Sequence, residues 1–238
     1  MLKRIRSACR AFLSPAAITA SLPFPPEGAE PSPLTRDVIN QLKDVKGFFN
    51  LDDCMHFYLL LQMQTMNGVR GDILEIGTYF GRSTMLLAYA LKTDERLVVC
   101  DAFADSIKDQ YSDVPTVEDV RKSIRRARKD FPFESLIVHS CLSTNLVLDP
   151  NSRFRFIHVD GGHTADVAYS DLVFTSRHLA DRGIIAIDDY KHPNWPGVTE
   201  ATDRFLSEQG HGLTVLADMN RHNAKGRKLY LIKAATSD

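Results

Sequence analysis

From residue 73 onward, short apolar runs alternate with longer segments in which apolar residues recur at helical spacing. The apolar runs predict strands over residues 73–76, 97–100, 136–139, 156–159 and 184–187. The helical spacing predicts helices over residues 83–91, 117–129 and 165–180. Strands that alternate with helices favour a parallel sheet, because parallel strands need long crossover connections. The pattern therefore predicts an α/β fold with helices on both faces of one sheet.

Further elements flank this alternating region. Helical spacing begins at Thr35 and recurs over residues 51–68, where Asn67 and Gly68 are typical of a helix end. Residues 213–234 contain two strand-like runs around a polar loop with Gly226, which predicts an antiparallel hairpin. With the hairpin, we expect a doubly wound, mostly parallel sheet of about seven strands.

The N-terminal residues 1–34 differ from the rest. A short helical stretch precedes residues 21–33, which contain five prolines and read as an irregular linker. We therefore place one domain at residues 35–238. The basic start and mild apolar stretch suggest a signal peptide, but Arg10 interrupts the apolar run, and we expect a cytoplasmic protein. No stretch approaches the roughly 20 apolar residues of a membrane span.

Composition and charge narrow the function classes. The 238 residues are 44% hydrophobic, enough for one sizeable core. With 29 basic and 30 acidic residues, the net charge of −1 provides no global attraction to nucleic acid or to a membrane surface. The four cysteines are widely spaced without a CxxC pair, so we expect reduced thiols. The sequence leaves the oligomeric state open, a homo-oligomer included.

The first predicted strand leads into "LEIGTYFGRST", where Gly77 and Gly81 bracket a turn before a helix. Such a turn exposes backbone N–H groups to a phosphate, a pyrophosphate or a carboxylate. Tyr79 stands where the dinucleotide fingerprint requires its second glycine, which argues against NAD. Asp101 follows 24 residues after Gly77, a separation suited to an acid that binds ribose, although it can also cap the next segment. Glu75, inside a buried strand, requires a partner.

Together, "LEIGTYFGRST" and "VVCDAF" resemble the first two motifs of class I S-adenosylmethionine-dependent methyltransferases. The resemblance implies that the methionine part of the cofactor is surrounded by Gly77, Thr78, Gly81 and Ser83. It further implies that Glu75 supports this loop, that Asp101 holds the ribose, and that Ser140 and Cys141 contact the adenine.

The fourth and fifth strands are followed by acids: Asp160 in "FIHVDGGH", and the pair Asp188 and Asp189 in "IIAIDDY". If these strands are neighbours, three carboxylates converge, and crowded carboxylates stay ionised only beside a cation. Oxygen ligands of this kind suit Mg²⁺. The alternative is that the acids are exposed loop residues and turn caps. Both paired acids reach one ion only if the strand ends at or before Asp188. His163, behind two glycines, has the right chemistry to accept a proton from an alcohol.

The same stretches, together with "PGV" at residues 196–198, resemble the metal-dependent sugar O-methyltransferases that modify macrolide antibiotics, the macrocin O-methyltransferase-like family. The resemblance implies Asp160, Asp188 and Asp189 as Mg²⁺ ligands and His163 as general base. Some of those enzymes have Glu where Asp188 stands. Catechol-type O-methyltransferases share this plan, but they carry lysine at the His163 position and Asp-Asn at the pair, so they are the alternative.

We therefore expect Mg²⁺-dependent methyl transfer from S-adenosylmethionine to a hydroxyl of a sugar or glycosylated small molecule. A nicotinamide-dependent oxidoreductase is less favoured, and a binding protein without catalysis is a third hypothesis. Tyr190 and Trp195 lie beside the paired acids; they can stack on a sugar ring, or Trp195 can anchor its loop. The long polar segment 101–120 is a candidate lid over the substrate.

Overall fold

The computed structural model describes residues 34–103 and 113–235. The predicted N-terminal helix and linker, and residues 104–112 of the candidate lid, lie outside the described residues. The helices of the described part are α2 (Arg36–Lys43), α3 (Leu51–Met66), α4 (Arg82–Tyr89), α5 (Val117–Ala127), α6 (Ala165–His178) and α7 (Pro196–Glu208). The strands are β1 (Asp72–Ile76), β2 (Leu97–Asp101), β3 (Leu136–Ser140), β4 (Phe154–Val159), β5 (Leu179–Tyr190), β6 (Leu213–Met219) and β7 (Arg227–Lys233). Short 3₁₀ turns lie at Phe133–Ser135 and Ser143–Asn145.

The strands form a single seven-stranded sheet in the order β3-β2-β1-β4-β5-β7-β6. Strands β1 to β5 pair with one another in parallel, and β7 is antiparallel to both β5 and β6. The strand order reverses between β1 and β4, and such a reversal opens a crevice at the carboxyl ends of the strands. The predicted α/β, doubly wound, mostly parallel fold with a C-terminal antiparallel hairpin is confirmed.

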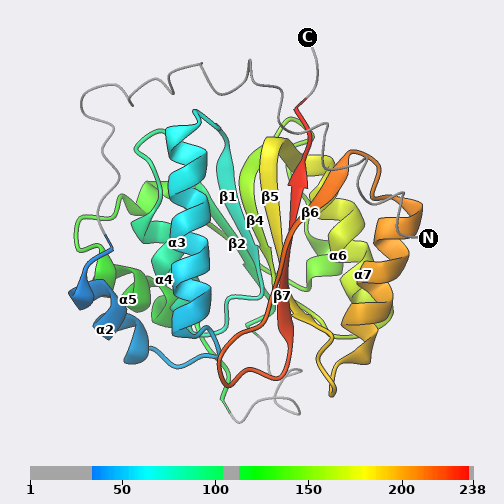
Figure 1. Cartoon of the computed structure of the whole chain (residues 1–238). Coiled ribbons are helices and arrows are strands. Elements are labelled where there is room, and N and C mark those ends of the chain that lie inside the picture. Colours follow the sequence, from blue (N-terminus) through cyan, green and yellow to red (C-terminus); the bar gives the residue numbers. More distant parts are fainter. Residues whose placement is uncertain (1–33, 104–112, 236–238) are drawn as a thin grey trace. The chain divides into compact units, whose positions relative to one another are not determined.

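Helices cover both faces of the sheet (Figure 1). The apolar cluster on one face draws residues from α2, α3, α4 and α5, and the cluster on the other face draws them from α6 and α7. Residues of one strand alternate between the clusters, as Ile73 and Leu74 of β1 do. The central strands are therefore buried on both sides, as expected for a parallel sheet.

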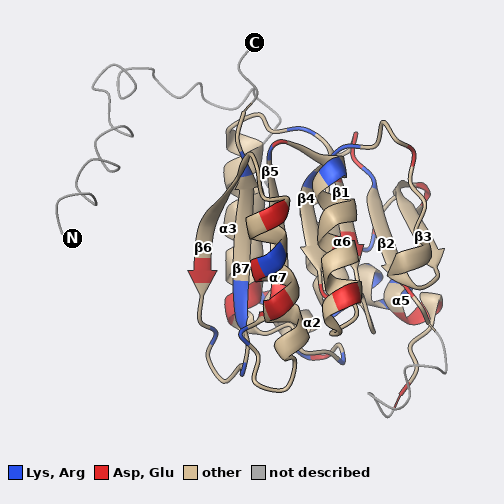
Figure 2. Ribbon diagram, turned by 90° about the vertical axis from the view of Figure 1, so that its right-hand side faces the viewer, with Lys and Arg blue, Asp and Glu red and all other residues tan. Residues whose placement is uncertain are grey.

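Helix α7 is the one long element that our sequence-based prediction missed. Pro196 is its first residue, a position where the missing N–H of proline costs nothing. Val198 and Phe205 provide its buried side. The exposed charged residues of α7 are mostly acidic: Glu200, Asp203 and Glu208 accompany a single basic residue, Arg204 (Figure 2).

No helix within the described residues combines the length and apolar character needed to cross a membrane.

Candidate active site

The predicted site residues lie at or near the carboxyl ends of the parallel strands. Glu75 is in β1, Asp101 ends β2, Ser140 ends β3, and Asp160 follows β4 directly. Because β1 is hydrogen-bonded to both β2 and β4, the predicted cofactor loop after β1 adjoins the loop that carries Asp160. The fold therefore brings the predicted cofactor and metal residues together at the carboxyl ends of the parallel strands.

The turn after β1 depends on Gly77. Its φ is +82°, and a Cβ at this position would overlap the backbone carbonyl of Asp160. The backbone N–H of Gly77 donates to Cys100 O at 2.8 Å, and that of Asp160 donates to Ile76 O at 2.8 Å. Glycine thus allows the ends of β1 and β4 to approach closely at the strand-order reversal.

Gly81, with φ of +81°, is the N-cap of α4 and makes no side-chain capping bond. Thr78 and Ser83 are buried beside this helix start. The backbone N–H groups in the first turn of α4 therefore receive no hydrogen bond acceptor from the N-cap side chain. Such groups favour a negatively charged ligand group.

Glu75 is fully buried and has its partners within the protein. Its carboxylate accepts hydrogen bonds from Thr84 Oγ1 and, at 2.9 Å, from His158 Nδ1. The Thr84 hydroxyl also contacts the Thr78 hydroxyl. A chain of hydrogen bonds therefore ties Glu75 to the turn after β1, an arrangement compatible with the predicted supporting role.

Asp101 holds the same turn from its other side. One carboxylate oxygen accepts the backbone N–H groups of Thr78 and Tyr79 at 2.9 Å each, and the other accepts the N–H of Phe103 at 3.0 Å. A carboxylate offers about four lone-pair sites, so this pattern still leaves room for a hydroxyl ligand.

The ends of β2 and β3 lie side by side. Ser140 pairs with Asp101 in register, and the N–H of Cys141 donates to Asp101 O at 3.0 Å. Cys141 Sγ is 3.8 Å from Cys100 Sγ, and the three described cysteines are all free thiols, as expected. Burial, and then the neighbouring Cys141, raise the pKa of the Cys100 thiol, which disfavours a reactive thiolate.

Asp160, His163 and Asp189 form one cluster. A ligand atom from each lies within 4.8 Å of the others. His163 Nε2 is 3.2 Å from Asp189 Oδ2, and its Nδ1 is buried without a hydrogen-bond partner among the described residues. These are two carboxylates and one imidazole around a shared space, a donor set able to hold a divalent cation.

Asp160 is in an electrostatically unfavourable position. Burial raises the pKa of this carboxyl well above its usual range, and the charges of Asp188 and Asp189 raise it further. A cation beside Asp160 would offset both effects. The site residues therefore fit a divalent metal ion in their chemistry.

Asp188 is placed differently from its neighbour. Strand β5 does not end before the acid pair; it runs to Tyr190, with a register shift between Ile187 and Tyr190. Asp189 lies within this irregular stretch and has a φ of +55°. Its carboxylate belongs to the cluster with Asp160 and His163. Asp188 instead forms ion pairs with Lys228 at 2.7 Å and Arg221 at 2.8 Å. We expected one ion to reach both Asp188 and Asp189 only if the strand ended at or before Asp188. Strand β5 continues beyond Asp188, so that condition is not met.

The pKa of Asp188 reflects these partners. Burial alone would raise it, but the charges of Lys228 and Arg221 outweigh burial and hold the pKa well below the usual range of an aspartate. Asp188 is therefore ionised and neutralised by the protein itself.

Trp195 and Tyr190 have separate roles. The Trp195 indole is stacked on the His163 ring, with centroids 4.3 Å apart and planes 17° from parallel. Tyr190 is buried, and its hydroxyl donates to Asp203 at 2.9 Å. Tyr190 thus packs in the core and does not form the wall we considered, while Trp195 orients the histidine.

Four buried residues near Asp188 were not identified in the sequence analysis. His158, Lys228 and Arg221 contact Asp188, and Asp53 contacts Lys228 and Arg221. His158 and Lys228 are fully buried. Both lie at buried positions of strands that are mainly apolar, "FRFIHV" and "RKLYLIK". A polar residue at an inward strand position needs a buried partner, and that signal was available in the sequence.

Comparisons with known proteins agree with this architecture. Residues 74–190 match the model of a family described as a methyltransferase domain. No curated protein is similar enough in sequence to match the chain.

Solved structures share the fold at low identity. The O-methyltransferase NovP superposes with a TM-score of 0.62 at 17% identity, over 79% of this chain and 81% of its own. CalS11, a TDP-rhamnose 3'-O-methyltransferase of calicheamicin biosynthesis, gives 0.58 at 19% identity over 85% and 88%. An O-methyltransferase from Bacillus cereus in complex with SAH gives 0.58 at 16% identity over 86% and 93%. The methyltransferase domain matched over residues 74–190 and the class I methyltransferase fold identify this protein as an S-adenosylmethionine-dependent methyltransferase enzyme.

Proposed function

We propose that this enzyme transfers the methyl group of S-adenosylmethionine to a hydroxyl of a sugar or glycosylated small molecule, and that it requires Mg²⁺. The observation that carries the proposal is the cluster of Asp160, His163 and Asp189 next to the turn after β1. The names of two proteins with this fold, NovP and the sugar methyltransferase CalS11, support O-methylation and a sugar acceptor.

The cofactor would lie across the ends of β1, β2 and β3. The methionine part would meet the turn at Gly77 and Thr78 and the start of α4 at Gly81 and Ser83, which Glu75 supports from below. Asp101 would bind the ribose through its remaining lone pairs. Ser140 and Cys141, at the end of β3, would contact the adenine.

The metal would be held by the carboxylates of Asp160 and Asp189. When bound, Mg²⁺ would act as a Lewis acid that lowers the pKa of the acceptor hydroxyl. Two carboxylates suffice for this ion, since Mg²⁺ in enzymes usually keeps several positions for water and substrate. Their two negative charges also match its two positive charges.

His163 would accept the proton of the acceptor hydroxyl. Its Nε2 lies 3.2 Å from Asp189 Oδ2, beside the two carboxylates that would hold the metal, and an imidazole has the right chemistry to take up a proton there. Stacking on Trp195 fixes the ring plane. S-adenosylmethionine would supply an electrophilic methyl group whose leaving group is a neutral thioether, so these residues would contribute mainly by positioning the acceptor oxygen.

A methyl-transfer assay tests the proposal. The full-length enzyme would be incubated with radiolabelled S-adenosylmethionine and a panel of glycosides and catechols, with Mg²⁺ or with a chelator. We expect transfer to at least one glycoside, loss in chelator and recovery on adding Mg²⁺. His163→Ala should lower the rate by about 10²-fold or more.

Three outcomes would each contradict a different part of the proposal. Preference for catechols would favour the catechol-type alternative. Full activity in the presence of the chelator would contradict the proposed requirement for Mg²⁺. Calorimetric binding of NAD without binding of S-adenosylhomocysteine would overturn the cofactor.

A further inference from the structure

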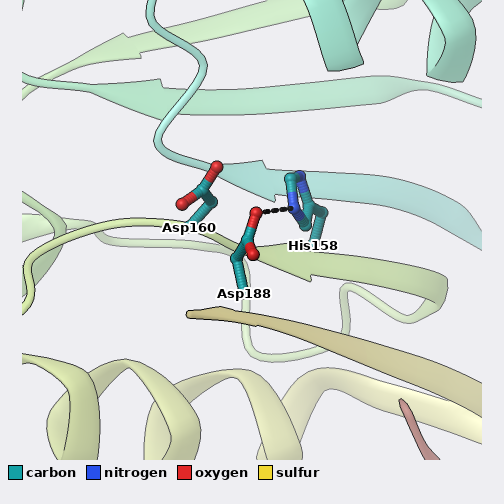
Figure 3. A group of neighbouring side chains, drawn as sticks. All are labelled: His158, Asp160 and Asp188. Carbon is teal, nitrogen blue, oxygen red and sulfur yellow. Dashed lines mark ion pairs between the residues drawn. The ribbon is translucent and has the colours of Figure 1, made fainter. Parts of the chain in front are cut away.

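Two donor sets share Asp160 at the carboxyl edge of the sheet. One is Asp160, His163 and Asp189, described above; the other is His158, Asp160 and Asp188, whose ligand atoms also lie within 4.8 Å of one another. Figure 3 shows Asp188 between Asp160 and His158, with Asp188 Oδ2 4.0 Å from His158 Nε2. By residue type alone, either set can hold a divalent cation.

The second set is already in contact with a cationic side chain, that of Lys228. The Lys228 side chain is fully buried, and its Nζ lies 2.7 Å from Asp188 Oδ2 and 3.2 Å from His158 Nε2. These are the atoms that a metal ion in this set would need. The Nζ also lies 5.2 Å from the ring centroid of Phe57, so packing on the α3 side helps to hold the ammonium in place.

Arg221 engages the remaining oxygen of Asp188. Its Nη1 is 2.8 Å from Asp188 Oδ1 and 3.3 Å from Asp53 Oδ2, and its Nη2 donates to Gly226 O at 3.2 Å. Asp53, in the first turn of α3, is also 3.7 Å from Lys228 Nζ. Both oxygens of Asp188 therefore have a buried cationic partner, and a second carboxylate shares those two cations.

Both ring nitrogens of His158 are also occupied. Nδ1 is 2.9 Å from Glu75, an acceptor when ionised, and Nε2 faces Lys228, which can only donate. The partners thus assign the hydrogen to Nδ1 and the lone pair of Nε2 to Lys228. Of this donor set only Asp160 remains available to a metal.

We propose that Lys228 and Arg221 are a built-in cationic counterpart to Asp188, and that the catalytic metal binds through Asp160 and Asp189 alone among the three aspartates. This inference rests on the metal-dependent function proposed above and departs from the three-aspartate set that the sugar O-methyltransferase resemblance implies. Asp188 and Lys228 are positioning residues: they join the ends of β5 and β7 and hold the segment from which Asp189 projects. The backbone N–H of Asp189 donates to Asp188 Oδ1 at 2.7 Å, which connects the two roles.

The test is calorimetric titration of Mn²⁺, a spectroscopically useful substitute for Mg²⁺, into the full-length enzyme without cofactor. Asp160→Asn and Asp189→Asn should each weaken Mn²⁺ binding by more than about tenfold. The double variant Asp188→Asn/Lys228→Met removes a carboxylate and its ammonium together, so the local charge is unchanged. We expect its Mn²⁺ affinity to stay within about threefold of the parent.

Thermal unfolding gives a second readout that does not depend on activity. Asp188→Asn alone removes the nearest carboxylate of both Lys228 and Arg221 and leaves these two buried cations to share Asp53. A buried charge that is no longer fully compensated is destabilising. The Tm of Asp188→Asn should therefore fall further than that of Asp189→Asn. If the double variant does not fold, Asp188→Asn replaces it in the titration and should lose less Mn²⁺ affinity than Asp160→Asn.

The outcomes separate the two proposals. If removing Asp188 weakens Mn²⁺ binding as much as removing Asp160 does, Asp188 is a ligand and this inference is wrong, while the proposed function stands. If the parent enzyme binds no Mn²⁺, the metal requirement itself is wrong in both proposals.

Discussion

At the scale of single residues, burial without a partner makes Asp171 a pH-dependent weak point. This α6 residue is 2% exposed, and its Oδ2 has no hydrogen-bond partner among the described residues. Burial raises the pKa of Asp171 to about 6, partly offset by a hydrogen bond with Ser143. The folded state therefore favours the protonated acid, whereas the unfolded chain ionises near its ordinary pKa of about 4.

This shift predicts that Asp171→Asn stabilises the protein at neutral pH. Below about pH 4 the acid is protonated in both states, and its contribution to stability is fully present. That contribution is lost as the pH rises toward 6, at a cost of up to about 3 kcal/mol. Urea unfolding at pH 7.5 should show the variant more stable by about 1–3 kcal/mol, with the difference shrinking toward pH 4. An equal gain from Asp130→Asn, at an exposed site, would refute this explanation.

At the scale of elements, the turn that joins β1 to α4 is predicted to depend on Gly77. Gly77→Ala should destabilise the protein by more than about 3 kcal/mol and abolish binding of S-adenosylhomocysteine, because the new methyl group meets the backbone after β4. Gly68→Ala is the matched control: its φ is +67°, but the space around it is open. There we expect a cost of about 1 kcal/mol, from the backbone conformation alone. Urea unfolding and calorimetry measure both effects; equal losses would contradict the close-approach explanation.

The elements also show where periodicity succeeds. The central strands were predictable because burial on both faces produces uninterrupted apolar runs. The extent of β5 was not, since "DDY" after "IIAI" reads as the start of a loop. Helix α7 was overlooked because Pro193 shortly precedes it and Pro196 is its first residue, and two prolines this close together are typical of irregular structure.

At the scale of the whole molecule, the two apolar clusters found within residues 34–103 and 113–235 are built from residues 38 to 231, and Leu34 packs against one of them. We therefore predict that a chain lacking residues 1–33 still folds cooperatively and binds S-adenosylhomocysteine. Its Tm should lie within about 3 °C of the full-length Tm in a thermal scan. A drop of more than about 10 °C would mean that the N-terminal segment contributes substantially to stability.

The sequence by itself determined the fold class and the edge of the sheet where chemistry would lie. Apolar periodicity identifies the strands, and in parallel sheets ligands bind at the carboxyl ends. Only the tertiary structure decided how the acids are shared out. Asp188 and Asp189 are adjacent in sequence, yet their nearest partners differ at the irregular end of β5. Asp188 lies 2.7 Å from Lys228 and 2.8 Å from Arg221, whereas Asp189 lies 3.2 Å from His163 and only 4.0 Å from Arg221. Lys228 and Arg221 come from the end of the chain, and their ion pairs depend on which strands become neighbours; periodicity carries no such information.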